Sequence, residues 1–307
     1  MGMMPSYIKL VASMHNRYQF QGPVCSLGNQ DVWASKEDLI NCLKEVNCRY
    51  TEPTSSTPHS SRTFSMNLEL TRLAKDFVHA KTMFETMGLF DYVDLDKFDS
   101  DSPEILHDLN LPIPEKLINR FGLVFDGGTI EHIFDVRQVL ENIGKMVCIN
   151  GCVIHLCSFS IDHGFYGFSP LFYYDYYSVN GFGEFECYLM ELDLSNVTQT
   201  YDRKHRYIKY QYGMSLDGVL DKDKEILIFF AARKFNEVTQ SIVPTQGSYA
   251  SRGNLEDAPP IINKSAFERL IPLGLQPLLR PFRRLLRAIY KKYLRYKARQ
   301  AATIRYI

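Results

Sequence analysis

The chain has 307 residues, 45% of them hydrophobic, and its 35 basic and 35 acidic side chains balance to a net charge of zero. This composition is ordinary for a globular protein and excludes a disordered or collagen-like chain. The clean apolar run at residues 226–232 is far shorter than the roughly 20 residues that a membrane-spanning helix needs.

Cysteine usage indicates the compartment. The seven cysteines include no C-x-x-C pair, so the sequence predicts neither a zinc site nor a disulfide framework. The N-terminus lacks the apolar segment of a secretory signal. We therefore expect a cytoplasmic protein whose thiols stay reduced. The histidines, cysteines and carboxylates also show no metal-ligand spacing, which favours a mechanism without a metal ion.

Strand and helix patterns alternate along the first three quarters of the chain. In chain order the predicted elements are a strand at 24–27, a helix from the capping pattern Ser35–Asp38 to about residue 46, a Ser/Thr/Pro-rich loop at 51–65, helical spacing at 67–87, strands at 91–96 and 104–108, a short helix after Pro114, a strand at 122–126, a helix face at 133–147, and strands at 152–157, 185–192 and 225–232. Residues 195–224 are polar and are interpreted as an insertion. This alternation predicts an α/β fold with a doubly wound, mostly parallel sheet.

Candidate ligand-binding residues come directly after the predicted strands. Gly28 follows the first strand, Asp94 and Asp96 close the second, and Asp108 follows the third. In an open α/β sheet, ligands bind outside the carboxyl ends of the strands, at the point where the strand order reverses. A carboxylate there can accept both hydroxyl hydrogens of a ribose, so this edge suits a ligand with a ribose and an adenine amino group.

Three longer motifs are distinctive: HDLNLPIP at 107–114, FGLVFDGGTIEHIFD at 121–135 and HGFYGFSPLFYYDYYSVNGF at 163–182. Together with Leu27-Gly-Asn-Gln30, they resemble class I S-adenosylmethionine-dependent methyltransferases, in particular a bacterial methyltransferase-domain group. The resemblance covers about residues 20–235. It implies a Rossmann-like fold, S-adenosylmethionine as the cofactor and methyl transfer to an acceptor.

The resemblance also implies roles for residues at the strand ends. Gly28 would lie against the methionine part of the cofactor, and Asp96, or failing it Asp94, would hold the ribose hydroxyls. The other implied contacts are Asp108 and Leu109 at the adenine, Asp126 and Gly127 at the methionine end, and Glu131 and His132 beside the transferable methyl group. A hydroxyl acceptor needs a general base near neutral pH, for which we expect His163 first and His132 second.

The loop after the first strand departs from this family. The family has a G-x-G-x-G-like run whose glycines allow positive φ, whereas this chain has Gly28 alone, followed by Asn29, Gln30 and Asp31. Asn and Asp tolerate left-handed backbone better than most residues, which favours a surviving turn. The alternative is a catalytically degenerate methyltransferase fold that acts as a membrane-associated binding or scaffold protein.

Two other features favour packing over chemistry. His155 lies inside an apolar strand, the usual place of a hydrogen-bonded core histidine. The aromatic run at residues 165–177 is predicted to pack a helix, with the alternative that one of its rings shapes the acceptor pocket.

The net charge of zero hides a basic C-terminal tail. Eleven Lys or Arg and no acidic residue lie between residues 269 and 307, which leaves 24 basic against 35 acidic side chains in the rest of the chain. Residues 278–296 show an apolar stripe flanked by Lys and Arg, the pattern of a helix lying on an anionic membrane. Docking on the acidic body or a dimer contact is the alternative, and nucleic acid is disfavoured because the body is acidic.

The chain is therefore divided into a methyltransferase-like domain at 1–235, a Pro- and Gly-containing linker at 236–264 and a basic amphipathic helical tail at 265–307. The predicted location is cytoplasmic, with peripheral attachment at the inner face of the membrane through the tail. The tail and the resemblance together point to a saccharide or a lipid-linked glycan precursor as the methyl acceptor.

Overall fold

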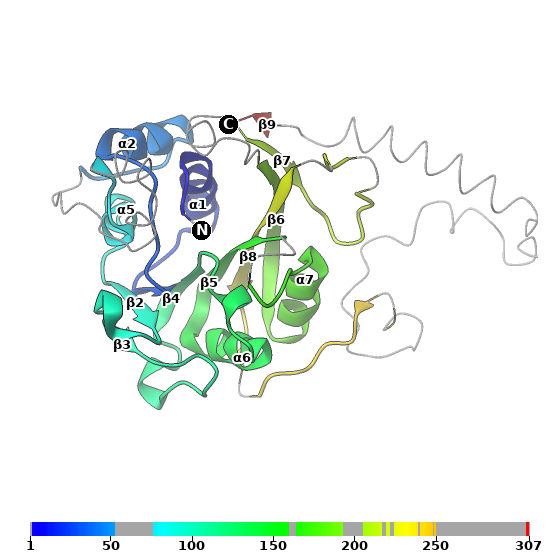
Figure 1. Ribbon diagram of the computed structural model, residues 1–307. Coiled ribbons are helices and arrows are strands. Elements are labelled where there is room, and N and C mark those ends of the chain that lie inside the picture. The colour runs from blue at the N-terminus through cyan, green and yellow to red at the C-terminus, as the bar shows by residue number, and fades with distance from the viewer. Residues whose placement is uncertain are drawn as a thin grey trace, which may run out of the picture.

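The structure is a computed structural model of the 307-residue chain. It describes residues 2–52, 76–159, 164–192, 205–216, 219–221, 224–238, 240–247, 249 and 305–306 (Figure 1). Several sequence predictions lie outside these residues: most of the loop at 51–65, the beginning of the helix at 67–87, the predicted base His163 and the tail helix at 278–296.

The described elements follow the predicted alternation. The helices are α1 (Pro5–Tyr18), α2 (Lys36–Glu45), α5 (Ala80–Thr86), α6 (Val136–Met146) and α7 (Pro170–Val179), with 3-10 turns η2 (Asp99–Asp101), η3 (Glu115–Leu117) and η4 (Ile130–His132). The strands are β1 (Val24–Leu27), β2 (Tyr92–Asp96), β3 (Ile105–Leu106), β4 (Phe121–Asp126), β5 (Val147–Ser158), β6 (Phe182–Leu192), β7 (Arg206–Lys209), β8 (Glu225–Lys234) and β9 (Arg305–Tyr306).

The strands form a single sheet in the order β3-β2-β1-β4-β5-β8-β6-β7-β9. The pairs from β3 to β5 are parallel, and β8 is antiparallel to both of its neighbours, β5 and β6. Strands β1 to β6 therefore run in one direction, which confirms the predicted doubly wound, mostly parallel and Rossmann-like α/β fold.

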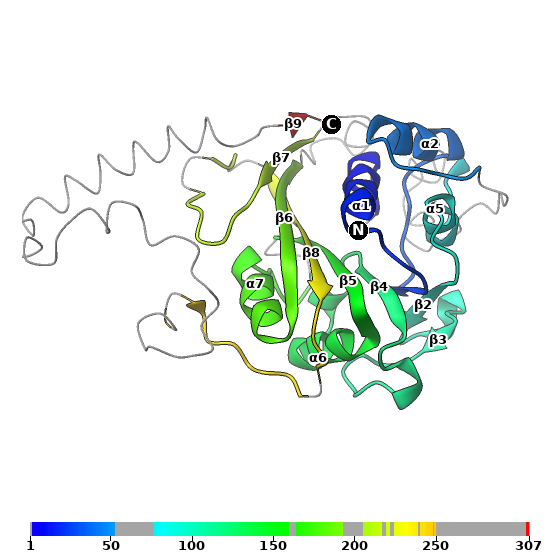
Figure 2. The same ribbon diagram turned by 180° about the vertical axis from the view of Figure 1, so that it is seen from behind.

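Helices cover both faces of this sheet (Figures 1 and 2). α1, α2 and α5 pack on one face through residues that include Tyr7, Leu39 and Phe84. α6 and α7 pack on the other face through residues that include Leu140 and Tyr177. The chain moves outward from β1 to β3, then returns to β4 on the other side of β1. The strand order thus reverses between β1 and β4, where ligands of open α/β sheets bind.

Local signals explain why the predicted elements begin where they do. The Ser35 side chain accepts the backbone N–H of Asp38 while the Asp38 carboxylate accepts the N–H of Ser35, and this capping box starts α2. The Asp135 side chain caps α6 by accepting the N–H of Gln138 at 3.1 Å. β5 begins earlier than predicted, because Asn150 takes a positive φ of 65° inside the strand rather than turning the chain before it.

Among the described elements, helix α1 and strand β7 were absent from the prediction. α1 buries most of its length, including Lys9, whose ammonium group lies 2.5 Å from a Glu45 carboxylate oxygen on α2. β7 lies within the segment interpreted as an insertion and pairs with β6. Both owe their position to contacts with distant parts of the chain.

The predicted linker begins as part of the body. Asn180, at the end of α7, accepts the N–H of Ile242 at 2.7 Å and donates to the Ile242 carbonyl at 2.9 Å. The Tyr176 hydroxyl lies 2.9 Å from the Ser241 hydroxyl, and Val238 is buried beside Gly144 of α6. The first part of the linker predicted at 236–264 is thus bonded to α7 and packed against α6.

The last described residues are 305–306, which lie beyond the tail helix predicted at 278–296. Arg305–Tyr306 form β9, which pairs antiparallel with β7 at the edge of the sheet (Figure 1). In the part of the chain that the structure describes, no helix is long and apolar enough to cross a membrane.

Candidate functional site

The loop after β1 brings two of the predicted residues together. Gly28 has a φ of +74°, which side chains rarely adopt, and its N–H donates to the Leu95 carbonyl on β2 at 2.8 Å. A Cβ built on Gly28 would lie 3.8 Å from Oδ2 of Asp96. The other oxygen of Asp96 accepts the N–H of Phe98 at 2.9 Å, which fixes the orientation of the carboxylate. The half-exposed Asp96 therefore lies beside Gly28 at the strand ends.

Asp94, the alternative to Asp96, lies elsewhere. Its carboxylate accepts the N–H of Glu104 at 3.1 Å, and the Glu104 carboxylate accepts the N–H of Asp94 at 3.1 Å. Burial and the Glu104 side chain raise the pKa of Asp94 to about 7. Asp94 thus ties β2 to the start of β3, and of the two carboxylates only Asp96 is placed against Gly28.

The predicted adenine residues occupy the loop after β3. The Asp108 carboxylate lies 2.8 Å from the Lys97 ammonium and accepts both the backbone N–H and the side-chain amide of Asn110. Lys97 first, and then Asn110, lower the pKa of Asp108 to about 2. Leu109 is buried, and its carbonyl accepts the side-chain amide of Asn142 at 3.0 Å.

Asn142 of α6 is a residue that sequence reasoning missed. Its amide donates to the carbonyls of Leu109 and Leu111, and its Oδ1 accepts the N–H of Ile113 at 3.2 Å. One buried side chain therefore fixes the path of the loop after β3. A lone polar position on the apolar face of the predicted helix was the signal that could have found it.

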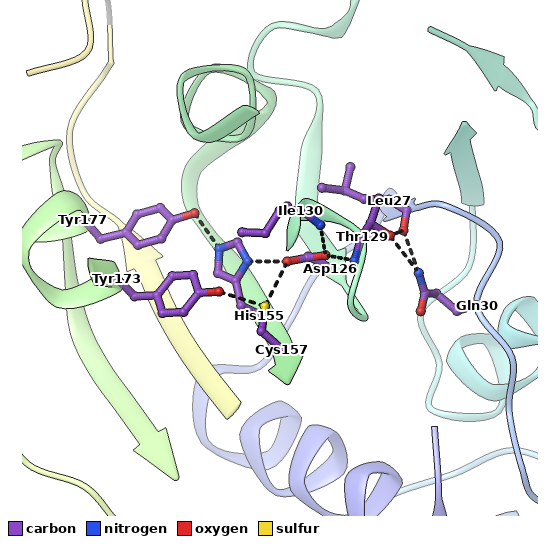
Figure 3. Close-up of polar contacts among 9 residues, drawn as sticks. All are labelled: Leu27, Gln30, Asp126, Thr129, Ile130, His155, Cys157, Tyr173 and Tyr177. Atoms are coloured by element: carbon purple, nitrogen blue, oxygen red, sulfur yellow. Dashed lines mark hydrogen bonds and ion pairs between the residues drawn. The ribbon is translucent and has the colours of Figure 1, made fainter. Parts of the chain in front are cut away.

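Asp126, predicted at the methionine end of the ligand, contacts the loop after β4 on one side and His155 on the other (Figure 3). Its side chain is fully buried, with Oδ1 accepting the N–H groups of Thr129 at 2.8 Å and Ile130 at 3.3 Å. Its Oδ2 lies 2.7 Å from Nδ1 of His155. Both carboxylate oxygens of Asp126 thus hold the loop after β4 and the core.

The contact of Asp126 continues into α7. Nε2 of His155 lies 2.7 Å from the Tyr177 hydroxyl, so an Nδ1–H donated to Asp126 leaves Nε2 to accept the tyrosine proton (Figure 3). Cys157 lies 2.8 Å from the Tyr173 hydroxyl, and burial raises the pKa of its thiol. His155 is therefore the core histidine that the sequence indicated, and Tyr173 and Tyr177 confirm that the aromatic run packs a helix.

The space between the loops after β1 and β4 is taken by the side chain of Gln30 (Figure 3). Its amide donates to the Leu27 carbonyl at 2.6 Å and lies 3.4 Å from the Thr129 hydroxyl. The Thr129 hydroxyl donates to the same Leu27 carbonyl at 2.5 Å. A Cβ built on Gly127 would lie 2.0 Å from Oε1 of Gln30, so the end of the glutamine side chain occupies the space that a side chain at Gly127 would need.

The turn η4 carries Glu131 and His132. Glu131 is fully buried, and neither carboxylate oxygen has a hydrogen-bond partner among the described residues. Burial, and next the negative charge of Asp126, raise the pKa of Glu131 to about 7. His132 is exposed at the end of the same turn. In the loop after β1, Oδ1 of Asn29 is likewise buried with no partner in the described part of the chain.

Comparisons with known proteins find only weak similarity. No family model matches the sequence, and no curated protein matches it. Similar solved structures include the MccD protein, at 12% identity over 76% of this chain and 100% of that one with a TM-score of 0.31. An S-adenosylmethionine-dependent methyltransferase from Archaeoglobus fulgidus has 12% identity, coverage of 74% and 94%, and a TM-score of 0.34. The YcgJ protein from Bacillus subtilis has 9% identity, coverage of 75% and 98%, and a TM-score of 0.33.

Proposed function

We propose that this protein binds S-adenosylmethionine at the carboxyl ends of β1 to β4 and transfers its methyl group to an acceptor. The observation that carries the proposal is the order of the candidate residues across the sheet. Asp108, Asp96, Gly28 and Gly127 follow the adjacent strands β3, β2, β1 and β4. An extended ligand that crosses the switch point would meet these residues in this order.

The residues present fit the nucleoside half of the ligand. Asp96 directs one carboxylate oxygen toward Gly28, where it would accept the ribose hydroxyls. The loop of Asp108 and Leu109, which Asn142 holds from below, would flank the adenine. Gly28 allows the ligand to approach the backbone because it carries no side chain.

The amino-acid half fits only if Gln30 turns aside, since its side chain lies across Gly127. The obstacle is the far end of a flexible side chain, and the loop backbone need not move. The buried acceptors that lack a partner among the described residues, Oδ1 of Asn29 and the Glu131 carboxylate, suit an ammonium group. We propose these two residues as its contacts.

S-adenosylmethionine supplies an activated methyl group when bound, so the protein's main task is to align an acceptor with it. His163 or His132 would take the proton of a hydroxyl acceptor. Near His132, the exposed rings of Phe134 and Phe165 pack edge to face with centroids 5.7 Å apart. This exposed aromatic pair supports an acceptor with an apolar face, such as a saccharide or a lipid-linked glycan precursor.

Calorimetric titration with S-adenosylhomocysteine tests the proposal. Asp96→Asn should weaken binding by about 1.5–3 kcal/mol, the range for hydrogen bonds to a charged group. Asp94→Asn is the matched control two residues away on the same strand, and its affinity should stay that of the unchanged protein. Weaker binding by Asp94→Asn alone would assign the contact with the ribose hydroxyls to Asp94. No binding to the unchanged protein, or equal affinity for all three proteins, would disprove the proposal.

A further inference from the structure

Gln30 is placed where a longer ligand would have to pass. It comes two residues after Gly28, the position at which a G-x-G pattern would have its next glycine. Its side chain is only 4% exposed and extends from the loop after β1 to the loop after β4 (Figure 3). Because β1 and β4 are neighbours, this side chain bridges the two strand ends at the switch point itself.

Specific contacts hold the side chain in this position. Its amide donates to the Leu27 carbonyl at 2.6 Å, which is shorter than a typical N–H···O distance. The same nitrogen lies 3.4 Å from the Thr129 hydroxyl. At the other end of the amide, Oε1 lies in the space that a side chain at Gly127 would need. The glycine after β4 and the glutamine after β1 are therefore complementary.

The path of the ligand follows from the strand order. Asp96 ends β2, Gly28 follows β1 and Gly127 follows β4, and these strands lie side by side in this order. A nucleoside held by Asp96 ends near Gly28. Any group attached to its 5′ position and continuing in the same direction next reaches the side chain of Gln30.

We propose that Gln30 is the residue that determines how much of a nucleoside ligand the site admits. In the arrangement described, the site takes an adenosine-containing ligand as far as its 5′ substituent. The amino-acid part of S-adenosylmethionine enters only when the Gln30 side chain leaves Gly127 and Leu27. The inference rests on the proposed function, since it concerns the same site.

Displacing Gln30 costs binding free energy, and only the amino-acid part of the ligand requires this displacement. Displacing Gln30 breaks its bond to Leu27 and exposes a carbonyl oxygen that Thr129 then satisfies alone. The net contribution of such a bond is modest, so the penalty reduces affinity without abolishing it. A ligand that ends at the 5′ carbon or sulfur leaves Gln30 in place and has no such penalty.

A matched pair of probes separates the two halves. 5′-Methylthioadenosine and S-adenosylhomocysteine share the nucleoside and the sulfur, and only the second carries the amino-acid part. The ratio of their dissociation constants, measured by calorimetry, reports the amino-acid part alone. In the unchanged protein the two should bind with similar affinity, because the new contacts of the amino acid and the displacement of Gln30 offset each other.

Three variants are compared. Gln30→Ala should tighten S-adenosylhomocysteine by about tenfold and leave 5′-methylthioadenosine unchanged, since only the first ligand meets the side chain. Gln30→Met keeps the length but cannot donate to Leu27, and it should show a smaller gain of the same sign. Gln21→Ala, before β1, also removes one glutamine bond, to the Gln19 carbonyl at 2.9 Å, and should change neither affinity. If Gln30→Ala does not fold, Gln30→Met carries the measurement.

The outcomes distinguish this inference from the proposed function. A gain for S-adenosylhomocysteine alone supports it. Binding of both probes with the same ratio in the unchanged protein and in the Gln30 variants would overturn it and leave the proposed function intact. Equal gains for both probes would also overturn it, because they would mean that Gln30 obstructs the whole ligand. No binding of either probe to any of the proteins would overturn the proposed function together with the inference.

Discussion

The two ends of the candidate site use the same residue type in opposite ways. At the end of β2, Asp96 is half-exposed, and one of its oxygens is directed toward Gly28. At the end of β4, Asp126 is fully buried and holds two backbone N–H groups and His155. A carboxylate at a strand end is therefore available to a ligand on one side of β1 and part of the core on the other.

The neighbouring strands cause this difference. β4 pairs with β5, whose long buried run brings His155 opposite Asp126 in the register. On its side away from β1, β2 pairs with β3, an edge strand of two residues. A strand end near the edge of the sheet keeps its side chain near solvent, whereas one in the middle of the sheet has a partner across the ladder. The scaffold role of Asp126 and the ligand role proposed for Asp96 can be separated by experiment.

The largest effect is expected at Asp126. Asp126→Ala would leave the N–H groups of Thr129 and Ile130 and the ring of His155 without their buried acceptor. Removing one member of such a buried polar group costs about 3–5 kcal/mol of unfolding free energy. Asp96→Ala should cost less than about 1 kcal/mol, since its carboxylate is partly exposed. Urea denaturation of the two variants measures both losses of unfolding free energy. Equal losses would contradict the assignment of Asp126 to the core and of Asp96 to the ligand site.

A second effect should depend on pH and belongs to Glu131. The pKa of its carboxyl is about 7 in the folded protein against an ordinary value of 4.5, because burial and Asp126 disfavour its charge. Between these values the folded state holds more protons than the unfolded state, so stability falls as pH rises through this window. The expected contribution is roughly 2–3 kcal/mol between pH 4.5 and 7.

Glu131→Gln should remove this part of the pH dependence and raise the melting temperature above pH 7. The buried Asp94, whose pKa is also about 7, should still contribute to the dependence of stability on pH in the variant. Glu115→Gln on the exposed surface of η3 is the control and should follow the unchanged protein at every pH. Thermal melts from pH 4 to 8 give the answer. A Glu131→Gln protein with the full slope would show that Glu131 is charged in the folded state.

The sequence predicted best those elements whose signals lie in residues close together in the chain. β1 was predicted at its observed bounds, and α2 begins at its capping box, because both signals are local. α1 escaped prediction because its buried Lys9 depends on Glu45, and β7 because it depends on β6. Such contacts join residues far apart in the chain and leave no local pattern.

The same limit applied to the site. Strand ends and their residue types placed Gly28 and Asp96 at one edge of the sheet, and in the structure the two residues are neighbours. The sequence could not tell that Asp126 faces His155, because the two are 29 residues apart and meet only through the register of β4 and β5. Gln30 was visible as a departure from the glycine pattern. Its position over Gly127 required the second loop.

The smallest predicted effect tests whether the buried group beneath the loop acts on the site. Tyr177 and Tyr176 are adjacent on α7, and both are buried with one hydroxyl contact, to His155 and to Ser241 respectively. Replacing either by Phe should cost about 1 kcal/mol of stability, the usual net contribution of one hydrogen bond.

Only Tyr177→Phe loosens the ring that faces Asp126, and Asp126 holds the loop after β4. We therefore expect Tyr177→Phe to weaken S-adenosylhomocysteine binding about two- to threefold, which is less than the tenfold change that 1.4 kcal/mol would cause. Tyr176→Phe should leave this affinity unchanged. Equal affinities for the two variants, at equal stability, would mean that the group under β4 supports the fold alone and that the site ends at the loop backbone.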